Sequence, residues 1–296
     1  MDTPQSPTEL TVETRFKVPN GTAMAEYGDA IVVTGPTGTR TLSGEAAQLS
    51  GDLLAASDGQ TPLGDVVPAI GDEATALAIA ERLSAAGLVY PVELLDGFDV
   101  DDNRLSLLET LLLGLDADSR PGFADRVRSL TVGLHGEPST TGQLGDAFGA
   151  FGCTTTDSDP DVLVFVEGDA TTDREAVNRA WLDSDATLVR AAVRGTEVEI
   201  GPVLSPSSES CLACLTTREE LNDAGRELTY RSLAPGPTYE TELCSHVLTR
   251  LTLRAGLARL PADLVGRLFR FDLRTLDYGE ARLFGVPGCD ACDGRD

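Results

Sequence analysis

Apolar positions in the first third of the chain fall into short runs separated by turn residues. Strand candidates lie at 15–18, 30–33 and 40–42, with glycine-rich turns such as 35–38 between them. Glycine supplies the positive φ that tight turns need, whereas β-branched and aromatic runs favour strands. The pattern therefore predicts a small three-stranded meander near the N-terminus.

Helical spacing follows this meander. Ser43 is a candidate N-cap for a helix at 44–57, and two further helices are predicted at 63–70 and 72–86. Apolar residues in the last of these helices recur three and four positions apart, so one face should be buried. These residues are Ala76, Ile79, Ala80 and Leu83.

A closing strand at 88–90 completes the element order of a winged helix-turn-helix over residues 15–95. Winged helices that recognise DNA carry several cations on the third helix, but here that helix offers only Arg82. DNA recognition is therefore disfavoured. We expect residues 1–14 to form a disordered tail and residues 96–125 to form a helical linker.

Residues 126–296 alternate between apolar strands and helices. This alternation predicts a parallel α/β domain. Two more predicted helices and a short fourth strand follow the first three strands and two helices. The predicted strands are 129–134, 161–166, 187–193 and 269–272, and the predicted helices are 140–151, 173–181, 241–257 and 262–268.

Composition agrees with a folded chain. Hydrophobic residues make up 41% of the sequence and charged residues 24%, which is too apolar for a wholly disordered protein. No stretch reaches the length of about 18 uncharged apolar residues that a membrane span needs, and the N-terminus has no signal-peptide pattern. We therefore expect a cytoplasmic protein without a membrane partner.

The charge balance is strongly acidic. There are 48 acidic against 23 basic residues, a formal charge of -25, and Lys17 is the single lysine. A dense carboxylate surface keeps a protein hydrated when concentrated salt screens its self-repulsion, so the pattern indicates a halophilic protein. The same charge excludes nucleic acid as an expected partner, because phosphate contacts need clustered cations.

Two cysteine pairs provide the most specific chemical signal. Cys211 and Cys214 form one C-x-x-C pair, and Cys289 and Cys292 form another near the chain end. Each pair can give two thiolates to one tetrahedral Zn²⁺, and four thiolates leave no position open for catalysis. The pattern therefore predicts a structural zinc site.

Other interpretations of the cysteines and histidines remain open. The pairs could be reduced, buried cysteines, or a redox pair, although redox pairs of the thioredoxin kind occur singly. Cys153 and Cys244 lack such spacing and are expected to be buried apolar residues. Neither His135 nor His246 lies in a nucleophile motif, so acid–base catalysis has no firm candidate.

The turn at 133–142 lies where a dinucleotide-binding protein carries its glycine-rich fingerprint, between a strand and a helix. Glu137 and Pro138 stand where bare backbone amides should approach phosphate. We therefore expect a structural turn and no nucleotide cofactor there.

The sequence resembles the partner proteins of YcaO-type cyclodehydratases, the ocin-ThiF-like leader-peptide-binding proteins of thiazole/oxazole-modified microcin biosynthesis. Ile200-Gly-Pro202 precedes the first cysteine pair and Phe271-Asp-Leu273 precedes the other pair, and both segments resemble the zinc segments of that family. The stretch 169–178 is similar to the Asp-Asn-x-x-x-Arg-x-x-x-Asn segment of ubiquitin-activating-like adenylating enzymes, with Ala170 replacing the first Asn.

The resemblance implies a winged-helix peptide recognition element followed by a degenerate ThiF-like, Rossmann-type domain that retains zinc and has lost its ATP site. A precursor leader peptide would add as a strand and lie against the helix at 72–86. A separate YcaO protein would supply the ATP chemistry, and a homodimer is allowed. The implied peptide-binding residues are Arg40, Thr41, Leu42, Ala76, Ile79, Ala80 and Leu83, with core packing as the alternative for each.

Two other functions compete with this scaffold. Asp169, Arg174 and Asn178 keep an enzyme-like spacing, which leaves an active adenylyltransferase of the ThiF and MoeB kind open. The N-terminal topology alone would also suit a winged-helix regulator.

Overall fold

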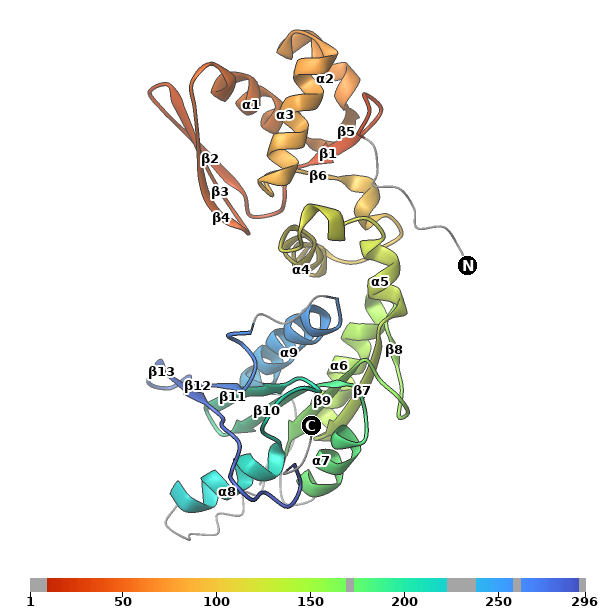
Figure 1. The fold of residues 1–296 in the computed structure, drawn as a ribbon. Helices are drawn as coiled ribbons and strands as arrows, with labels where there is room; N and C mark the ends of the chain where they lie inside the picture. Colours follow the sequence, from red (N-terminus) through yellow and green to blue (C-terminus); the bar gives the residue numbers. More distant parts are fainter. Residues whose placement is uncertain (1–9, 169–172, 223–237, 258–261, 293–296) are drawn as a thin grey trace. The chain divides into compact units, whose positions relative to one another are not determined.

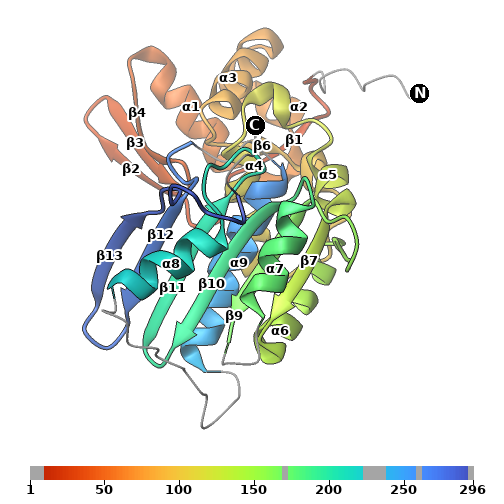
Figure 2. The ribbon, with the colours of Figure 1, turned by 60° about the horizontal axis from the view of Figure 1, so that its bottom comes forward.

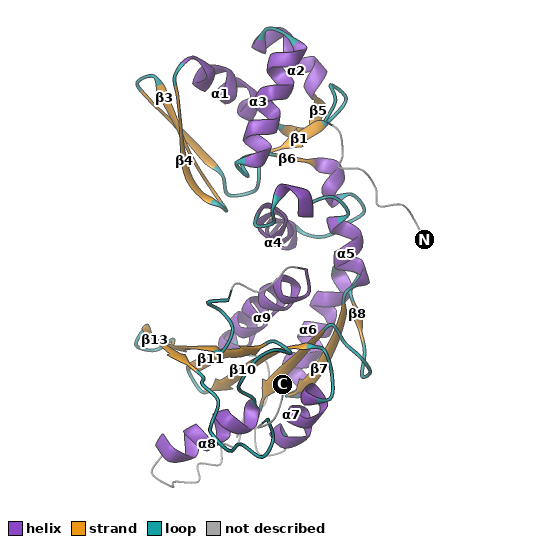
Figure 3. Ribbon diagram, viewed as in Figure 1, coloured by secondary structure: helices purple, strands orange, loops and turns teal. Residues whose placement is uncertain are grey.

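A computed structural model describes residues 10–168, 173–222, 238–257 and 262–292. The chain divides into two compact units, residues 1–126 and 127–296 (Figure 1). Figure 3 shows helices and strands in both.

The first unit contains an antiparallel meander of three strands. β2 (Ala23–Tyr27), β3 (Ala30–Gly35) and β4 (Gly38–Ser43) pair in chain order, and residues 28–29 and 36–37 form the turns. The prediction that the meander begins at 15–18 is wrong. The strand at 23–27 was missed because its sequence, AMAEY, has no β-branched residue.

The segment at 15–18 instead belongs to a second small sheet. β1 (Arg15–Lys17) lies between β5 (Asp58–Pro62) and β6 (Tyr90–Pro91), antiparallel to both. Phe16 is 2% exposed and packs into the core of the unit. This pairing joins segments far apart in sequence, which local pattern cannot anticipate.

Three helices cover the core of the first unit: α1 (Glu45–Ala56), α2 (Leu63–Ile70) and α3 (Glu73–Ala85). The side chain of Asp72 caps α3, because its carboxylate accepts a hydrogen bond from Thr75 N at 2.9 Å. The apolar stripe predicted for α3 is buried as expected: Ala76, Ile79, Ala80 and Leu83.

α4 (Asp102–Leu113) is anchored to the first unit by a buried carboxylate. Glu109 accepts hydrogen bonds from Lys17 Nζ at 3.0 Å, Asn20 N at 2.7 Å and Tyr90 OH at 2.8 Å. Burial and this carboxylate raise the pKa of Tyr90, which keeps its hydroxyl protonated as the donor. The remaining elements are the 3₁₀ turns Val92–Leu95 and Ala117–Ser119 and the helix α5 (Phe123–Ser129).

The second unit is built on a mixed sheet in the order β13-β12-β11-β10-β9-β7-β8. The strands β7 (Thr131–Gly136), β8 (Thr154–Thr155), β9 (Val162–Glu167) and β10 (Thr187–Arg194) are parallel. The strands β11 (Glu197–Leu204), β12 (Arg267–Asp272) and β13 (Asp277–Arg282) continue it antiparallel. The predicted parallel winding therefore covers four of the seven strands.

Helices cover both faces of this sheet (Figure 2). α6 (Pro138–Ala150) and α9 (Tyr239–Leu257) pack together on one face, and α7 (Arg174–Leu182) and α8 (Leu212–Asn222) pack on the other. Strand residues alternate between the two layers, so Leu163 and Phe165 join the α7–α8 core. Among the described helices, none combines the length and the apolar content that crossing a membrane demands.

The helix expected at 262–268 is wrong. Residues 262–264 form a turn, Val265 forms a parallel bridge with Val203, and Gly266 has a φ of 74°. A helix cannot continue through that conformation. β12 begins directly afterwards, because its partner strand β11 requires an extended neighbour.

Candidate metal centre and the neighbouring ion-pair network

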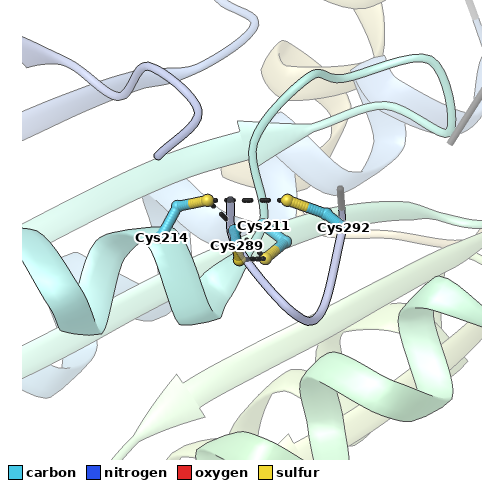
Figure 4. A group of neighbouring side chains, drawn as sticks. All are labelled: Cys211, Cys214, Cys289 and Cys292. Atoms are coloured by element: carbon cyan, nitrogen blue, oxygen red, sulfur yellow. Dashed lines mark hydrogen bonds between the residues drawn. The ribbon is translucent and has the colours of Figure 1, made fainter. Parts of the chain in front are cut away.

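Four cysteines from two distant segments meet beside the sheet. Cys211 follows β11, and Cys214 lies in the first turn of α8. Cys289 and Cys292 lie on a turn near the chain end, and the four sulfurs face one another (Figure 4). The predicted ligands are thus brought together.

The sulfur spacing fits one metal ion. All four Sγ atoms lie within 4.8 Å of one another, with Sγ–Sγ distances of 3.9 Å for Cys211–Cys214, 3.9 Å for Cys211–Cys289 and 3.5 Å for Cys214–Cys292. A tetrahedron with Zn–S bonds of about 2.3 Å has S–S edges of roughly 3.8 Å. Four thiols at these distances match the donor set of structural zinc.

The protein around these cysteines suits a bound cation. Burial raises the pKa of Cys211 and of Cys292, so thiols there would hold their protons without a positive charge. A divalent ion reverses this preference because it stabilises thiolates. Val286 N also donates to the Cys214 sulfur at 3.3 Å, as an amide does to a metal-bound thiolate.

The first cysteine pair opens a helix after a strand, an arrangement that redox-active pairs also use. Here, however, Cys211 and Cys214 each lie against a sulfur of the other pair. All four cysteines are free of disulfides. This four-sulfur environment favours a closed structural site, because four protein ligands leave no open coordination position.

Asn178 supports the cysteine segment. Its Oδ1 accepts a hydrogen bond from Leu212 N at 2.9 Å, and its side chain is buried. Leu212 is the first residue of α8, so this bond satisfies an amide that the helix itself leaves unpaired. The residue that the sequence placed in an adenylation-like segment therefore helps to hold the metal centre.

The strand-to-helix turn after β7 is closed by its own carboxylate. Glu137 accepts from Ser139 N at 3.1 Å and Thr140 N at 2.8 Å, and from both hydroxyls. Burial opposes this charge, but the four hydrogen bonds hold the pKa of Glu137 below its ordinary value. Backbone amides at a helix start can bind a phosphate, but those at the start of α6 already donate to the Glu137 carboxylate.

Gly136 explains why the turn can pass so close to the next strand. Its φ is 117°, and a Cβ built there would lie 1.8 Å from Val166 O. Only glycine fits at this approach. The glycine therefore serves strand packing in this turn.

Arg174 is fully engaged with the protein. Its guanidinium forms an ion pair with Glu167, donates to Glu219 Oε2 at 2.6 Å and donates to Thr216 Oγ1 at 2.8 Å. Asp169 and Ala170, the other positions compared with the adenylating segment, lie outside the described residues. Arg174 consequently has little capacity left for a nucleotide.

A network of arginines and glutamates extends from this point across the sheet. Arg190, which is 0% exposed, forms ion pairs with Glu167 and with Glu199 at 3.1 Å. Arg194 and Arg270 also reach Glu199, at 2.9 Å and 2.5 Å. Burial opposes the Glu199 charge, but the arginines lower its pKa to about 2. This network was not predicted from the sequence, because its members are scattered from β9 to β12.

The residues proposed for peptide binding fall into two groups. Arg40 and Thr41 are exposed on β4, and Leu42 is half-buried against the core. The α3 residues are buried within that core: Ala76, Ile79, Ala80 and Leu83 are at most 6% exposed. Only the β4 group presents surface that a peptide could contact without rearrangement.

Cys153 and Cys244 are buried, as expected for apolar cysteines. Burial raises the pKa of each thiol to about 12, which makes it unreactive near neutral pH. His135 and His246 belong to no metal-ligand cluster within the described residues.

Comparison with known proteins defines the fold. No family model and no curated protein matches this sequence. A structure described as a heterocyclase in complex with substrate and cofactor matches with a TM-score of 0.68 at 17% identity, and heterocyclase TruD matches with 0.65 at 18%. Each alignment covers 94% of this chain but only 39% and 43% of the heterocyclase chains.

The Escherichia coli enzyme MccB is similar over its whole length. The TM-score is 0.61 at 9% identity, and the alignment covers 95% of this chain and 97% of MccB. MccB is a microcin C7 biosynthetic enzyme that has been solved in complex with N-formylated MccA. The chain therefore has a mixed α/β fold that resembles MccB and part of the heterocyclases, and it carries four clustered cysteines that suit a structural metal such as zinc.

Proposed function

We propose that this chain is a non-catalytic scaffold that binds the leader of a ribosomally made precursor peptide. It presents that peptide to a separate YcaO-type, ATP-dependent cyclodehydratase, which forms azoline or azole rings. The observation that carries the proposal is that the chain's own carboxylates occupy the donors that adenylation would need, at the start of α6 and at Arg174. Glu137 caps the α6 amides, and Arg174 is committed to Glu167 and Glu219.

Adenylate chemistry needs free donors where the triphosphate lies. Catalysis of phosphoryl and nucleotidyl transfer depends on amides, arginines and metal ions aimed at the phosphates. A carboxylate already occupies the amides at the α6 terminus, so an incoming phosphate would meet a like charge. A scaffold has no need of that site, whereas an adenylating enzyme does.

The fold comparison supports a part in peptide modification. The chain spans less than half of the length of the heterocyclases that it resembles. One of those heterocyclases is described with substrate and cofactor bound. We infer that substrate capture belongs to this chain and that a YcaO partner supplies the cyclodehydratase chemistry.

Leader binding is assigned to the outer edge of β4, in a first unit that we interpret as a winged-helix peptide recognition element. The two residues that flank a two-residue hairpin turn form a hydrogen-bonded pair. Further along the strands, non-hydrogen-bonded and hydrogen-bonded pairs alternate, and the residues of a non-hydrogen-bonded pair point their N–H and C=O groups away from each other. Counting from the pair Gly35–Gly38 places the N–H and C=O of Thr39 and Thr41 on the outer edge of β4. Within the described residues no strand pairs there, so a peptide can add by β-augmentation.

Side chains on β4 would supply selectivity. Arg40 pairs in register with buried Val33, and Leu42 with buried Ile31, so both lie on the helix-facing side of the meander. We assign the direct contacts to Arg40, Thr41 and Leu42. The stripe at Ala76, Ile79, Ala80 and Leu83 forms the core behind them, and contact with it would require local opening.

A binding measurement tests the assignment. In 2–3 M KCl, a fluorescently labelled leader peptide titrated into the full chain should give saturable anisotropy. The substitution Thr41→Pro removes an outward N–H from β4 and should weaken binding by at least tenfold, since a proline cannot donate to an added strand.

Glu26→Pro is the matched control. Tyr27 and Ala30 flank the turn between β2 and β3, so the same alternation directs the Glu26 N–H away from β3. Glu26 therefore lies on the outer edge of β2, the opposite edge of the same sheet. It should bind leader as the unchanged protein does. Equal losses in the two variants, or no saturable binding at all, would refute leader capture at β4.

An active adenylyltransferase is the second candidate, and the full-length similarity to MccB favours it. Pyrophosphate exchange into ATP, measured with and without peptide, separates the two. A scaffold gives no exchange, whereas turnover that Arg174→Ala abolishes would establish the enzyme.

A further inference from the structure

A cavity of about 410 Å³ lies between α8 and the hairpin of β12 and β13. Leu215, Leu268 and Leu283 provide an apolar lining, and Arg218 and Arg282 stand among the polar lining residues. The volume falls within the range of small-molecule sites, about 300–1,000 Å³. The peptide edge at β4 and the four cysteines contribute nothing to it.

Two arginines at this cavity have no acidic partner among the residues that the structure describes. Within the described part of the chain, neither Arg218 nor Arg282 forms a salt bridge. Arg218 donates from Nε to Phe284 O at 3.1 Å and from Nη2 to Gly285 O at 3.3 Å. The Arg282 guanidinium lies 5.6 Å from the centroid of the Phe284 ring. Phe284 and Gly285 thus contact both guanidinium groups, and each group keeps donors that bond to none of the described residues.

The other charges of the lining are balanced from outside the cavity. Glu219 is paired with Arg174, Glu280 with Arg267, and Arg270 with Glu199. Counting the described residues alone, the lining therefore keeps the uncompensated charge of Arg218 and Arg282. Acidic residues outnumber basic ones about two to one in this chain, so a positive cavity departs from the general surface.

We propose that this cavity binds a small anion, a carboxylate or phosphate group carried on an apolar body. The planar guanidinium groups can each bind such a group through two parallel hydrogen bonds, and the leucines would cover the apolar part. Bidentate contacts tolerate concentrated salt better than long-range attraction does, because screening acts mainly on separated charges. The site is independent of leader capture and of nucleotide chemistry.

Calorimetric titrations of the full chain in 2 M KCl test the proposal with three probes. Hexanoate carries a carboxylate on an apolar body, inorganic phosphate carries the anion alone, and hexylamine carries the same body with the opposite charge. Saturable binding of hexanoate, phosphate or both, without hexylamine binding, supports the site and shows which anion it prefers. Binding of none, or of hexylamine as well as hexanoate, overturns it.

Variants locate the binding. Arg282→Gln should weaken the preferred anion by at least tenfold, and Arg282→Lys should restore only part of that loss, because lysine lacks the planar pair of donors. Arg274→Gln is the control, since Arg274 is 74% exposed near the same hairpin and does not line the cavity. Equal binding by the Arg282→Gln and Arg274→Gln proteins would overturn the assignment even if an anion binds elsewhere.

Discussion

Glu199 shows at the level of one residue how the buried network holds a charge. Its side chain is 1% exposed and is reached by Arg190, Arg194 and Arg270. A buried carboxylate without such partners would take up a proton, but the arginines lower the pKa of Glu199 to about 2. Folding is therefore linked to pH at this position.

Acid unfolding should reveal this link. Since the folded pKa of Glu199 lies below its ordinary value, its contribution is complete above about pH 4.5 and is lost as pH falls towards 2. A shift of that size corresponds to roughly 3 kcal/mol in unfolding free energy. Urea unfolding between pH 7 and pH 2 measures it, and Glu199→Gln should flatten the pH dependence.

Glu197→Gln is the matched control, because Glu197 also pairs with Arg270 but its side chain is 36% exposed. It should change stability by less than about 1 kcal/mol. A Glu199→Gln protein that is as stable at pH 7 as the Glu197→Gln protein would contradict the assigned role of the network.

The cysteines give another prediction at residue scale. Protein purified without chelator should contain one zinc per chain by elemental analysis. Cys289→Ser should remove it and lower the melting temperature, because a metal that binds only the folded chain stabilises by about 4 kcal/mol at 1,000 times its Kd. Cys153→Ser, at a buried cysteine outside the cluster, should keep the zinc.

At the scale of elements, the turn from β7 to α6 shows how the chain satisfies the amides at a helix start. A Rossmann-type turn leaves amides free at the helix start. Here Glu137 and Pro138 replace that arrangement, and the helix is capped by the Glu137 side chain. The amides of Ser139 and Thr140 are therefore bonded to a carboxylate of the turn itself.

Removing this cap should destabilise the helix. Glu137→Ala leaves the amides of Ser139 and Thr140 without their acceptor, which costs about 1 kcal/mol in unfolding free energy by denaturant titration. Glu175→Ala, at an exposed position of α7, should be close to neutral. If the two variants were equally stable, the cap would not contribute as argued.

Hydrophobic periodicity predicted some of the helices and strands and missed others. Periodicity predicted α3, α6, α7 and α9 and the strands β7, β9 and β10, because each buries a regular face. The elements that it missed include β2, β5, β11, β13 and α8, and it wrongly placed a helix at 262–268. Those segments take their form from partners: β13, for example, has every residue exposed and is held by pairing with β12.

The whole molecule carries a formal charge of -25. Like charges on this surface repel, and a Debye length of about 3 Å at 1 M salt removes most of that repulsion. The buried ion pairs around Arg190 are screened much less by salt. Salt should therefore stabilise the fold and leave the network intact.

Unfolding measured at several KCl concentrations tests this expectation. The melting temperature should rise between 0.2 M and 3 M KCl, because salt relieves repulsion that the compact state suffers most. Sorbitol at matched water activity serves as the control, since it does not screen charge. A melting temperature that fell with KCl would show that exposed ion pairs, and not repulsion, dominate.

The sequence by itself determined the features that depend on residue type and short spacing. Two C-x-x-C pairs predicted the four-cysteine cluster, excess carboxylates set the negative net charge, and Glu137 with Pro138 replaces a glycine-rich fingerprint. Only the tertiary structure decided what long-range neighbours do. Asn178 became a support for the metal centre, and charges from β9 to β12 met in one network. The reason is physical: spacing fixes geometry within a turn, whereas strand order fixes which distant side chains share a low-dielectric space.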